Sequence, residues 1–384
     1  MTAEIYSLSF GGSGVGKING KICFVEGALP GEKILFDVIK DTAKYIQGKT
    51  KEIIISSKDR IEPVCSYYSV CGGCQTQHIA YDKELFYKQQ QVSEIIDRIS
   101  GEKGIVPGDI VPSLSCYHYR SSVTLHKGKQ GYGFCKKNSS DIIKIEECLV
   151  AEEAINKAIK MLDQGKSGDK KITLKQDHNG RVWNSGRYGE RFFIDNYRGK
   201  DIYFSPKGFS QPNRNIAEKI TETLELWIGD TDPDTVFFDA YCGVGFFCFL
   251  LKQKFALKAG IDTARTAIDC AKTTAKKHKV NNIKFYKGCA EEVFFGIFKD
   301  NKKSKNILFL DPPRSGVDPV FCDELAKNSE IERIYYLSCN PPVLARDIKR
   351  LRKYGIWKLQ RITPFDMFPR TKHIEVLAEF LREK

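Results

Sequence analysis

The stretch TVFFDAYCGVGFF, residues 235–247, decides the fold that this sequence predicts. It begins with a short apolar run that ends at Asp239, and Gly243 and Gly245 follow where a helix is expected to start. This order is typical of the first strand-to-helix turn of a nucleotide-binding sheet, because only glycine lets the backbone approach a ligand closely. The stretch therefore predicts an α/β domain with a ligand site at this turn.

The segments around this stretch continue an alternation of strands and helices. Apolar runs that predict further strands are LKAGID (257–262), IKFYKG (283–288), NILFLDPP (306–313), RIYYLSCN (333–340) and VLAEFL (376–381). Strands that alternate with helices form a doubly wound, mainly parallel sheet. We therefore predict a Rossmann-like domain over residues 206–384.

The glycine turn favours S-adenosylmethionine over a dinucleotide. A dinucleotide site has a third glycine at position 248, where this chain has Cys248. S-adenosylmethionine has no pyrophosphate, so it does not need that glycine. Asp262 ends the next strand, from which a carboxylate can accept hydrogen bonds from both ribose hydroxyls. We expect the methyl donor at Gly243 and Gly245, with a dinucleotide enzyme as the alternative.

Two residues near the carboxyl end have the chemistry needed to methylate a pyrimidine ring. Cys339 ends a strand at the edge where such sheets place their active sites, and Glu375 begins the terminal strand. A thiolate that adds to carbon 6 pushes electrons onto carbon 5, which can then attack a methyl sulfonium. A base such as Glu375 must afterwards remove the carbon 5 proton. Taken alone, Cys339 would more often be a buried core thiol.

The predicted strand that precedes the Cys339 strand in the sequence ends in Asp311-Pro312-Pro313-Arg314. Methyltransferases of exocyclic amines have an aromatic residue after the two prolines, and RNA cytosine-5 methyltransferases have a cysteine there. Arg314 argues against both classes. The alternative interpretation is a strand end capped by proline without a chemical role.

Near the start of the chain, FGGSGVGKI (residues 10–18) imitates a phosphate-binding loop. It matches G-x-x-x-x-G-K-[ST] except at Ile18, which has no hydroxyl for magnesium. A phosphate-binding lysine opens a helix, whereas Lys17 is followed by a turn and the strand-like KICFVEG. Residues 20–58 have the alternating pattern of strands. We therefore expect a hairpin in a small barrel and not a nucleotidase.

The composition indicates a globular protein that attracts polyanions. The 384 residues are 41% hydrophobic and carry a net charge of +13, which favours RNA or DNA as a partner, although solvated lysines explain the charge as well. The first ten residues do not have the pattern of a signal peptide, and no apolar run reaches the roughly 18 residues of a membrane span. We expect a cytoplasmic protein with reduced thiols.

Four of the 13 cysteines are candidate metal ligands. Cys65, Cys71 and Cys74 have the spacing C-x5-C-x2-C, and Cys148 lies far downstream. Four thiolates can hold zinc or an iron–sulfur cluster, and His78 is a rival ligand for zinc. The residues by themselves leave both metals open.

The central region, residues 59–205, is expected to be mostly β. A helix is predicted over residues 81–99, where it can pack on the catalytic domain, and short strands follow it. The segment YHYRSSVTLHKGKQGYGFCKK mixes aromatic residues with Arg120, Lys136 and Lys137, as sites for unstacked bases and phosphates do. A solvated sheet explains these cations about as well.

The ordered set FSQPN, DAYCGVG, DPPR, LSCNPP and MFPRTKHIE resembles the S-adenosylmethionine-dependent RNA uracil-5 methyltransferases over essentially the whole chain. The resemblance implies that Cys339 is the nucleophile and Glu375 the base. It also implies that the methyl donor is bound by Gln211, Tyr241, Asp262 and Asp311. At two further donor-site positions, Phe246 and Cys289, and at Pro212, the chain departs from the family pattern.

The same resemblance implies that residues 1–58 form a TRAM domain, which is an OB-like RNA-binding barrel, and that the four cysteines hold a 4Fe-4S cluster. We predict an enzyme that makes 5-methyluridine in 23S rRNA, with RNA as its partner, no membrane contact and a monomeric state. Transfer RNA is the alternative substrate. Two rival functions are an RNA cytosine-5 methyltransferase and an RNA-binding iron–sulfur protein without activity.

Overall fold

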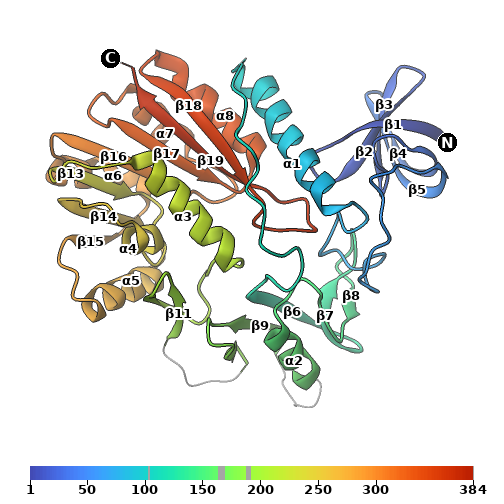
Figure 1. The fold of residues 1–384 in the computed structure, drawn as a ribbon, viewed down its shortest axis with the longest axis horizontal. Coiled ribbons are helices and arrows are strands. Elements are labelled where there is room, and N and C mark those ends of the chain that lie inside the picture. The colour runs from blue at the N-terminus through green and yellow to red at the C-terminus, as the bar shows by residue number, and fades with distance from the viewer. Residues whose placement is uncertain (103, 163–168, 187–191, 384) are drawn as a thin grey trace.

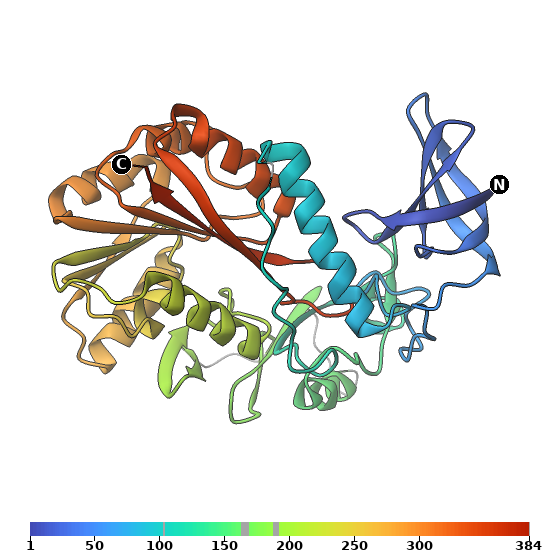
Figure 2. The same ribbon diagram turned by 45° about the horizontal axis from the view of Figure 1, so that its top comes forward.

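The computed structural model describes residues 1–102, 104–162, 169–186 and 192–383. Its amino-terminal barrel, small central sheet and large carboxyl-terminal sheet are joined by a long helix (Figures 1 and 2). Helices cover both faces of the large sheet (Figure 1). Within the described ranges, every helix is too short or too polar to cross a lipid bilayer.

The barrel closes through five strands in the order β1-β2-β3-β5-β4. Ile5, Val25, Ile34 and Phe36 fill its interior. Val38, which by alternation has the same face of the strand as Ile34 and Phe36, is exposed because only the first half of its strand is covered. The strands span Thr2–Leu8 (β1), Ser13–Ile18 (β2), Lys21–Glu26 (β3), Lys33–Asp41 (β4) and Tyr45–Ile55 (β5).

The glycines that imitate a phosphate-binding loop belong to this barrel. Gly11 and Gly12 turn the chain with φ angles of 120° and 87°, and Lys17 lies in β2, paired with Ile22 of β3. A Cβ atom at Gly16 would lie 2.7 Å from the carbonyl oxygen of Glu4, so glycine is required by strand packing. The prediction of a hairpin in a small barrel is confirmed.

The long helix that follows the cysteine segment connects the barrel to the large sheet (Figure 2). It consists of α1, Tyr81–Ile95, and a π-helical turn, Ile96–Ser100, so the helix predicted over 81–99 is confirmed. Its apolar residues Val92, Ile95 and Ile96 are buried in the core of the large sheet. On the other side, Gln91 Nε2 donates hydrogen bonds to carbonyl oxygens of the barrel's first turn, at 3.1 and 3.2 Å.

The central sheet has the strand order β10-β9-β6-β7-β8 and carries helix α2, Glu153–Leu162, on one face. Val123, Leu125, Ile172 and Leu174 pack against that helix. Because side chains alternate along a strand, the residues between them point to the opposite face. The strands span Ser122–Gly128 (β6), Gly131–Cys135 (β7), Ile142–Lys144 (β8), Lys171–Gln176 (β9) and Val182–Asn184 (β10).

A two-stranded hairpin, β11 (Phe193–Tyr197) and β12 (Lys200–Phe204), precedes the large sheet. Its buried side chains Phe193, Tyr197 and Ile202 pack in the same core as helix α3 (Arg214–Ile228) and the large sheet. The predicted domain division at residue 206 therefore lies after a hairpin that packs in the core of the large sheet.

The large sheet has the order β15-β14-β13-β16-β17-β19-β18, in which the first five strands are parallel. Strand β19 runs antiparallel to both of its neighbours, β17 and β18. The predicted doubly wound α/β architecture is confirmed. Its strands span Thr235–Asp239 (β13), Leu257–Asp262 (β14), Ile283–Lys287 (β15), Lys305–Leu310 (β16), Arg333–Ser338 (β17), Trp357–Phe365 (β18) and Glu375–Arg382 (β19). Its helices span Arg214–Ile228 (α3), Phe246–Leu250 (α4), Arg265–Lys277 (α5), Ala290–Asn301 (α6), Pro319–Lys327 (α7), Pro341–Leu351 (α8) and the 3₁₀ turn Arg352–Tyr354.

A buried ionic network fastens α1 to the loop that precedes β19. The Lys88 ammonium lies 2.8 Å from Glu84 Oε1 and 2.7 Å from Asp366 Oδ1. Arg370 donates its backbone N–H to Glu84 Oε1 at 2.8 Å, and its guanidinium lies 3.3 Å from Glu84 Oε2. Because all four side chains are at most 5% exposed, each charge depends on the others for compensation.

Replacement of Lys88 by Met tests this dependence. The variant leaves Glu84 and Asp366 as buried carboxylates without their shared cation, so we expect the free energy of unfolding to fall by about 3–5 kcal/mol. Urea denaturation measures the change. Lys83→Met on the same helix removes a 39% exposed lysine and should change stability by less than about 0.5 kcal/mol. Equal stabilities of the two variants would contradict the role given to the network.

Candidate active site

The candidate catalytic residues meet at one edge of the large sheet. The carboxyl ends of the parallel strands β16 and β17 lie side by side, and Asp311 and Cys339 follow these two strands. Strand β19 runs in the opposite direction, with Val376 opposite Ser338. Its first residue, Glu375, therefore lies beside Cys339, although 35 residues of sequence lie between the two.

The charges at this edge act on one another. Burial raises the pKa of the Cys339 thiol to about 11; the Glu375 carboxyl adds to this rise and Arg314 opposes it. Burial, and then Asp311, raises the pKa of Glu375 well above its usual range, while Arg314 again opposes the rise. Burial also raises the pKa of Asp311 to about 7. The edge thus combines a thiol, two carboxyl groups and one cation.

Arg314 and His373 are functional candidates that the sequence analysis did not assign to the site. Arg314 was used only to exclude other methyltransferase classes, although its position directly after the two prolines could have indicated a cation at the edge. His373 stands two residues before Glu375, and burial, followed by Arg314, lowers its pKa to about 4, so its ring is neutral at pH 7. Both residues line one cavity.

Asp262 and the glycine turn, which are predicted to bind the methyl donor, lie together in the structure. Asp262 Oδ2 accepts the N–H of Gly243 at 2.9 Å, and Oδ1 accepts the N–H of Ala264 at 2.7 Å. Gly243 and Gly245 have φ angles of 54° and 78°, and a Cβ atom on Gly245 would lie 2.5 Å from the Phe285 ring. The carboxylate is therefore held at the turn, where its remaining lone pairs can accept ribose hydroxyls.

Two other predicted donor residues occupy different surroundings. The Phe246 side chain is buried in the core with its ring centre 4.9 Å from that of Tyr197, so only its backbone is available to a donor. Gln211 lies in the loop before α3, where its carbonyl oxygen accepts a hydrogen bond from Ser121 at 3.3 Å. Asn213 caps α3 and bonds to Ser113, which holds this loop in place.

Cys289 and Tyr241 share a partner that the sequence analysis missed. Cys289 Sγ donates to Glu291 Oε2 at 2.6 Å, and the Tyr241 hydroxyl donates to Glu291 Oε1 at 2.8 Å. Glu291 lies in the first turn of α6, the helix that Cys289 precedes as its N-cap residue. An acid two residues beyond Cys289 was the signal in the sequence.

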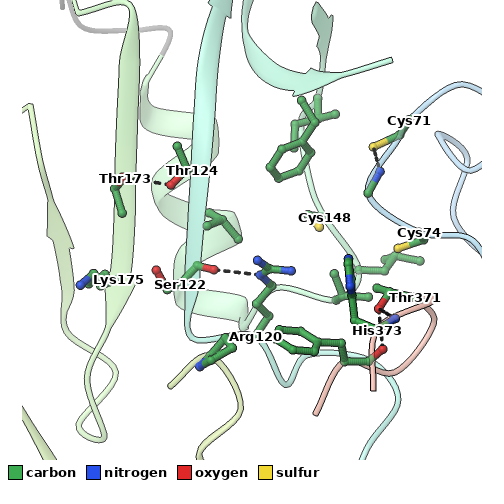
Figure 3. A pocket seen from close by; sticks show the side chains of 18 of the residues that line it. Cys71, Cys74, Arg120, Ser122, Thr124, Cys148, Thr173, Lys175, Thr371 and His373 are labelled. Atoms are coloured by element: carbon green, nitrogen blue, oxygen red, sulfur yellow. Dashed lines mark hydrogen bonds between the residues drawn. The ribbon is translucent and has the colours of Figure 1, made fainter. Parts of the chain in front are cut away.

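The four predicted metal ligands line a single cavity of about 630 Å³ (Figure 3). Burial raises the pKa of Cys74 to about 12 and that of Cys148 to about 11. In the part of the chain that the structure describes, no three histidine, cysteine or acidic side chains are grouped closely enough to hold a metal ion. His78, the predicted rival ligand, is not among the described residues of the cavity wall, and its Nδ1 bonds to the Tyr68 hydroxyl.

The three predicted RNA-binding residues do not lie together. Arg120 lines the cavity, with its guanidinium between the central strands and the cysteines (Figure 3). Lys136 forms a backbone bridge to Cys71. Lys137 lies 3.8 Å from Glu26 of the barrel and 4.5 Å from the centre of the Tyr68 ring. Lys136 and Lys137 thus fasten the central sheet to its neighbours.

Comparison with known proteins identifies the family. The family model described as tRNA (Uracil-5-)-methyltransferase matches residues 158–383, and that of the TRAM domain matches residues 1–58. An uncharacterized RNA methyltransferase of Clostridium tetani is 30% identical over 443 residues, which cover 98% of this chain and 95% of that protein. The 23S rRNA (uracil(1939)-C(5))-methyltransferase RlmD of Photobacterium profundum is 30% identical, with coverages of 97% and 92%.

A solved structure shares the whole fold. Pyrococcus abyssi tRNA (uracil-54, C5)-methyltransferase, crystallised with S-adenosyl-L-homocysteine, superposes with a TM-score of 0.76 at 22% identity and covers 99% of this chain. The superposition also covers 100% of the chain of that protein. The family match over residues 158–383 and the relatives of 30% identity show that the chain belongs to the S-adenosylmethionine-dependent RNA uracil-5 methyltransferases and carries a TRAM domain at its amino terminus.

Proposed function

We propose that this enzyme converts a uridine of 23S rRNA to 5-methyluridine through a covalent adduct with Cys339. The observation that carries the proposal is the pairing of β17 with the antiparallel β19, because it brings a thiol and a carboxyl group together at the sheet edge. The 23S rRNA substrate is favoured by relatives of nearly full length that carry this name. Transfer RNA is the second candidate, supported by the shared fold of the Pyrococcus enzyme.

In the proposed reaction, the Cys339 thiolate adds to carbon 6 of the uracil ring. The resulting electron pair on carbon 5 takes the methyl group of S-adenosylmethionine and releases S-adenosylhomocysteine. Glu375 then accepts the carbon 5 proton, and the carbon–sulfur bond breaks to give 5-methyluridine and free Cys339. Arg314 stabilises the thiolate before attack, since its charge opposes the rise in the thiol pKa.

Donor binding in this proposal uses Asp262 for the ribose and the glycine turn for close approach of the backbone. Asp311, Gln211, Tyr241 and Cys289 complete the candidate site. Phe246 would contribute only through its backbone, because its ring is buried.

We further propose that Cys65, Cys71, Cys74 and Cys148 hold a 4Fe-4S cluster within the region 59–205. Their thiols share one cavity wall, and four thiolates can hold either zinc or an iron–sulfur cluster. The resemblance to the family favours the cluster. The bound cluster would supply a rigid crosslink between the cysteine segment and Cys148. The methyl transfer itself needs no electron from it.

Substitution of the two catalytic candidates should separate the proposed steps. Cys339→Ala should lower methyl transfer by about 10⁴-fold or more and abolish the covalent RNA adduct, because no thiolate remains. Glu375→Gln should trap a methylated adduct that survives on a denaturing gel, because the carbon 5 proton is not removed. The assay uses labelled S-adenosylmethionine with unmodified 23S rRNA and tRNA. Cys322→Ala, a buried thiol of α7, is the matched control and should remain active. Normal turnover by both site variants would refute the mechanism.

The raised thiol pKa predicts how Cys339 reacts with iodoacetamide. Because the thiolate is the reactive form and the pKa is about 11, alkylation should accelerate about tenfold per pH unit between pH 7 and 9. Arg314→Gln should slow it about three- to tenfold at each pH, since the opposing charge is lost. Peptide mass spectrometry isolates the rate at Cys339. Arg265→Gln, at an 80% exposed side chain, should leave the rate unchanged; an equal effect of both variants would exclude a local role of Arg314.

The cluster proposal is tested by metal content. Protein purified without oxygen should contain iron and sulfide, and Cys74→Ser should lose most of the iron because one of four ligands is gone. Cys135→Ser replaces an exposed neighbouring thiol outside the cavity wall and should retain it. Zinc in place of iron in the wild type would contradict the proposal, as would full iron content in Cys74→Ser.

A further inference from the structure

Gln75, which directly follows the C-x2-C cysteines, bonds to the loop of residues 366–374 that leads into β19. Its backbone N–H donates to the carbonyl oxygen of Arg370 at 3.0 Å. Its side-chain Oε1 accepts the N–H of Lys372 at 3.2 Å, although the two residues are 297 positions apart. Gln75 therefore satisfies one backbone group of the loop on each side of Thr371.

The side chain of Gln75 is also fixed to the cysteine segment itself. Its Nε2 donates to the carbonyl oxygen of Gly72 at 2.9 Å, and the backbone carbonyl oxygen of Gln75 accepts the Tyr68 hydroxyl at 2.8 Å. A primary amide can donate and accept at the same time. Because both amide atoms are engaged, the N–H of Lys372 meets an acceptor whose position is set by the cysteine segment.

The loop that receives these bonds carries the residues that precede the catalytic carboxyl group. Thr371 and His373 both line the cavity shown in Figure 3. Thr371 Oγ1 accepts the N–H of His373 at 3.3 Å, so the backbone at Lys372 lies inside a turn closed by its own hydrogen bond. A displacement of the peptide at Lys372 would therefore displace His373, two residues before Glu375.

The two catalytic candidates depend on this loop to different extents. Glu375 is the first residue of β19, so strand pairing holds its carboxyl side whereas the loop holds its amino side. Cys339 instead follows β17, which pairs with β16 and β19, and α8 begins two residues later at Pro341. Within the described ranges, the hydrogen bonds of Gln75 reach neither β17 nor α8. Loss of its side chain should thus affect Glu375 and leave Cys339 in place.

We propose that Gln75 is a positioning residue for removal of the carbon 5 proton, because it holds the loop from which Glu375 reaches that proton. The inference rests on the proposed function, in which Glu375 is the base. A base acts only within hydrogen-bond reach of the proton, and a misplacement of about 1 Å can cost about 100-fold in rate. Gln75 is only partly buried and Lys372 is exposed, so water can replace the lost bonds and stability should change little.

The test follows the covalent adduct during a single turnover, with labelled S-adenosylmethionine and the RNA that the wild type methylates. Gln75→Met keeps the length of the side chain but has no amide. The methylated adduct should form at the wild-type rate and be released about 10- to 100-fold more slowly, so that it accumulates on a denaturing gel. Normal release would overturn the proposal. Equal slowing of adduct formation would overturn it too, since that indicates a general structural effect.

Two variants separate this bridge from other effects of substitution. Gln75→Glu keeps an oxygen for the N–H of Lys372 and should recover most of the lost release rate. Gln253→Met removes another partly buried glutamine, whose Nε2 donates to the carbonyl oxygen of Glu225 at 2.8 Å, and it should release the adduct like the wild type. Release as slow in either variant as in Gln75→Met would contradict the role given to Gln75.

Binding and metal content are measured in the same preparations. The affinities for RNA and S-adenosylmethionine and the metal content of Gln75→Met should equal those of the wild type. Loss of metal would assign Gln75 to the cysteine site alone and overturn the proposal. If Gln75→Met cannot be purified, Gln75→Asn decides, because its shorter side chain cannot bond to Gly72 and Lys372 together. Normal release in Gln75→Asn would overturn the proposal.

The failure of this inference differs from the failure of the proposed function. A wild type without activity on any RNA, or a Glu375→Gln variant that traps no adduct, would defeat the proposed function. Normal release in the Gln75 variants, with an adduct still trapped by Glu375→Gln, would defeat the positioning role alone.

Discussion

The ion pairs of Lys88 with Glu84 and Asp366 are the interaction on which the arrangement of the active site depends. They are buried, and they join a helix near the start of the chain to the loop that leads into β19. That loop also accepts two hydrogen bonds at the carbonyl oxygen of Arg370, from the N–H groups of Gln75 and Thr76. The residues next to Cys74 and the residues before Glu375 are therefore held by one polar network. A displacement of either segment would leave buried charges without partners.

This network explains why the cysteine segment and the catalytic edge share one cavity. Tyr81 donates its hydroxyl to Asp366 at 2.9 Å and accepts the N–H of Ser113, so the linker before the central sheet is held at the same place. Tyr119 in turn donates to the carbonyl oxygen of Pro369 at 3.0 Å. Contacts from three sequence segments thus fix the wall between the central sheet and the large sheet. The result is a concave surface to which three sequence segments contribute.

The sequence predicted the parts of this molecule that follow from local pattern. The strand-to-helix rhythm, the glycine turn at Gly243 and the barrel around Gly16 depend on periodicity and on backbone geometry, and the structure confirms them. The burial of Phe246 and the exposure of Val38 were not predictable, because each depends on which element covers the face. A periodic pattern predicts which face of a strand or helix is apolar, but it does not predict which element packs against that face.

Contacts between residues that are distant in the sequence could not be predicted either. Tyr241 and Cys289 both donate hydrogen bonds to Glu291 because the fold brings the ends of two strands together. The sequence does not show that these ends are close. Nor does it show that Gln75 bonds to the loop before β19. In both cases, the sequence shows the polar residue but not the distance to its partner.

The protonation of the catalytic edge is the last consequence of this geometry. Burial raises the pKa of the Cys339 thiol and of the Glu375 carboxyl, so it opposes the reactive, ionised form of each group. Arg314 favours the ionised form of both, but it can fully compensate only one negative charge. Since the proposed reaction uses the thiolate first and the carboxylate second, a single cation can serve both steps in succession. In this order, the negative charge of the thiolate passes to the ring on addition and is neutralised by the methyl sulfonium, so Arg314 does not face an ionised Cys339 and an ionised Glu375 in the same step.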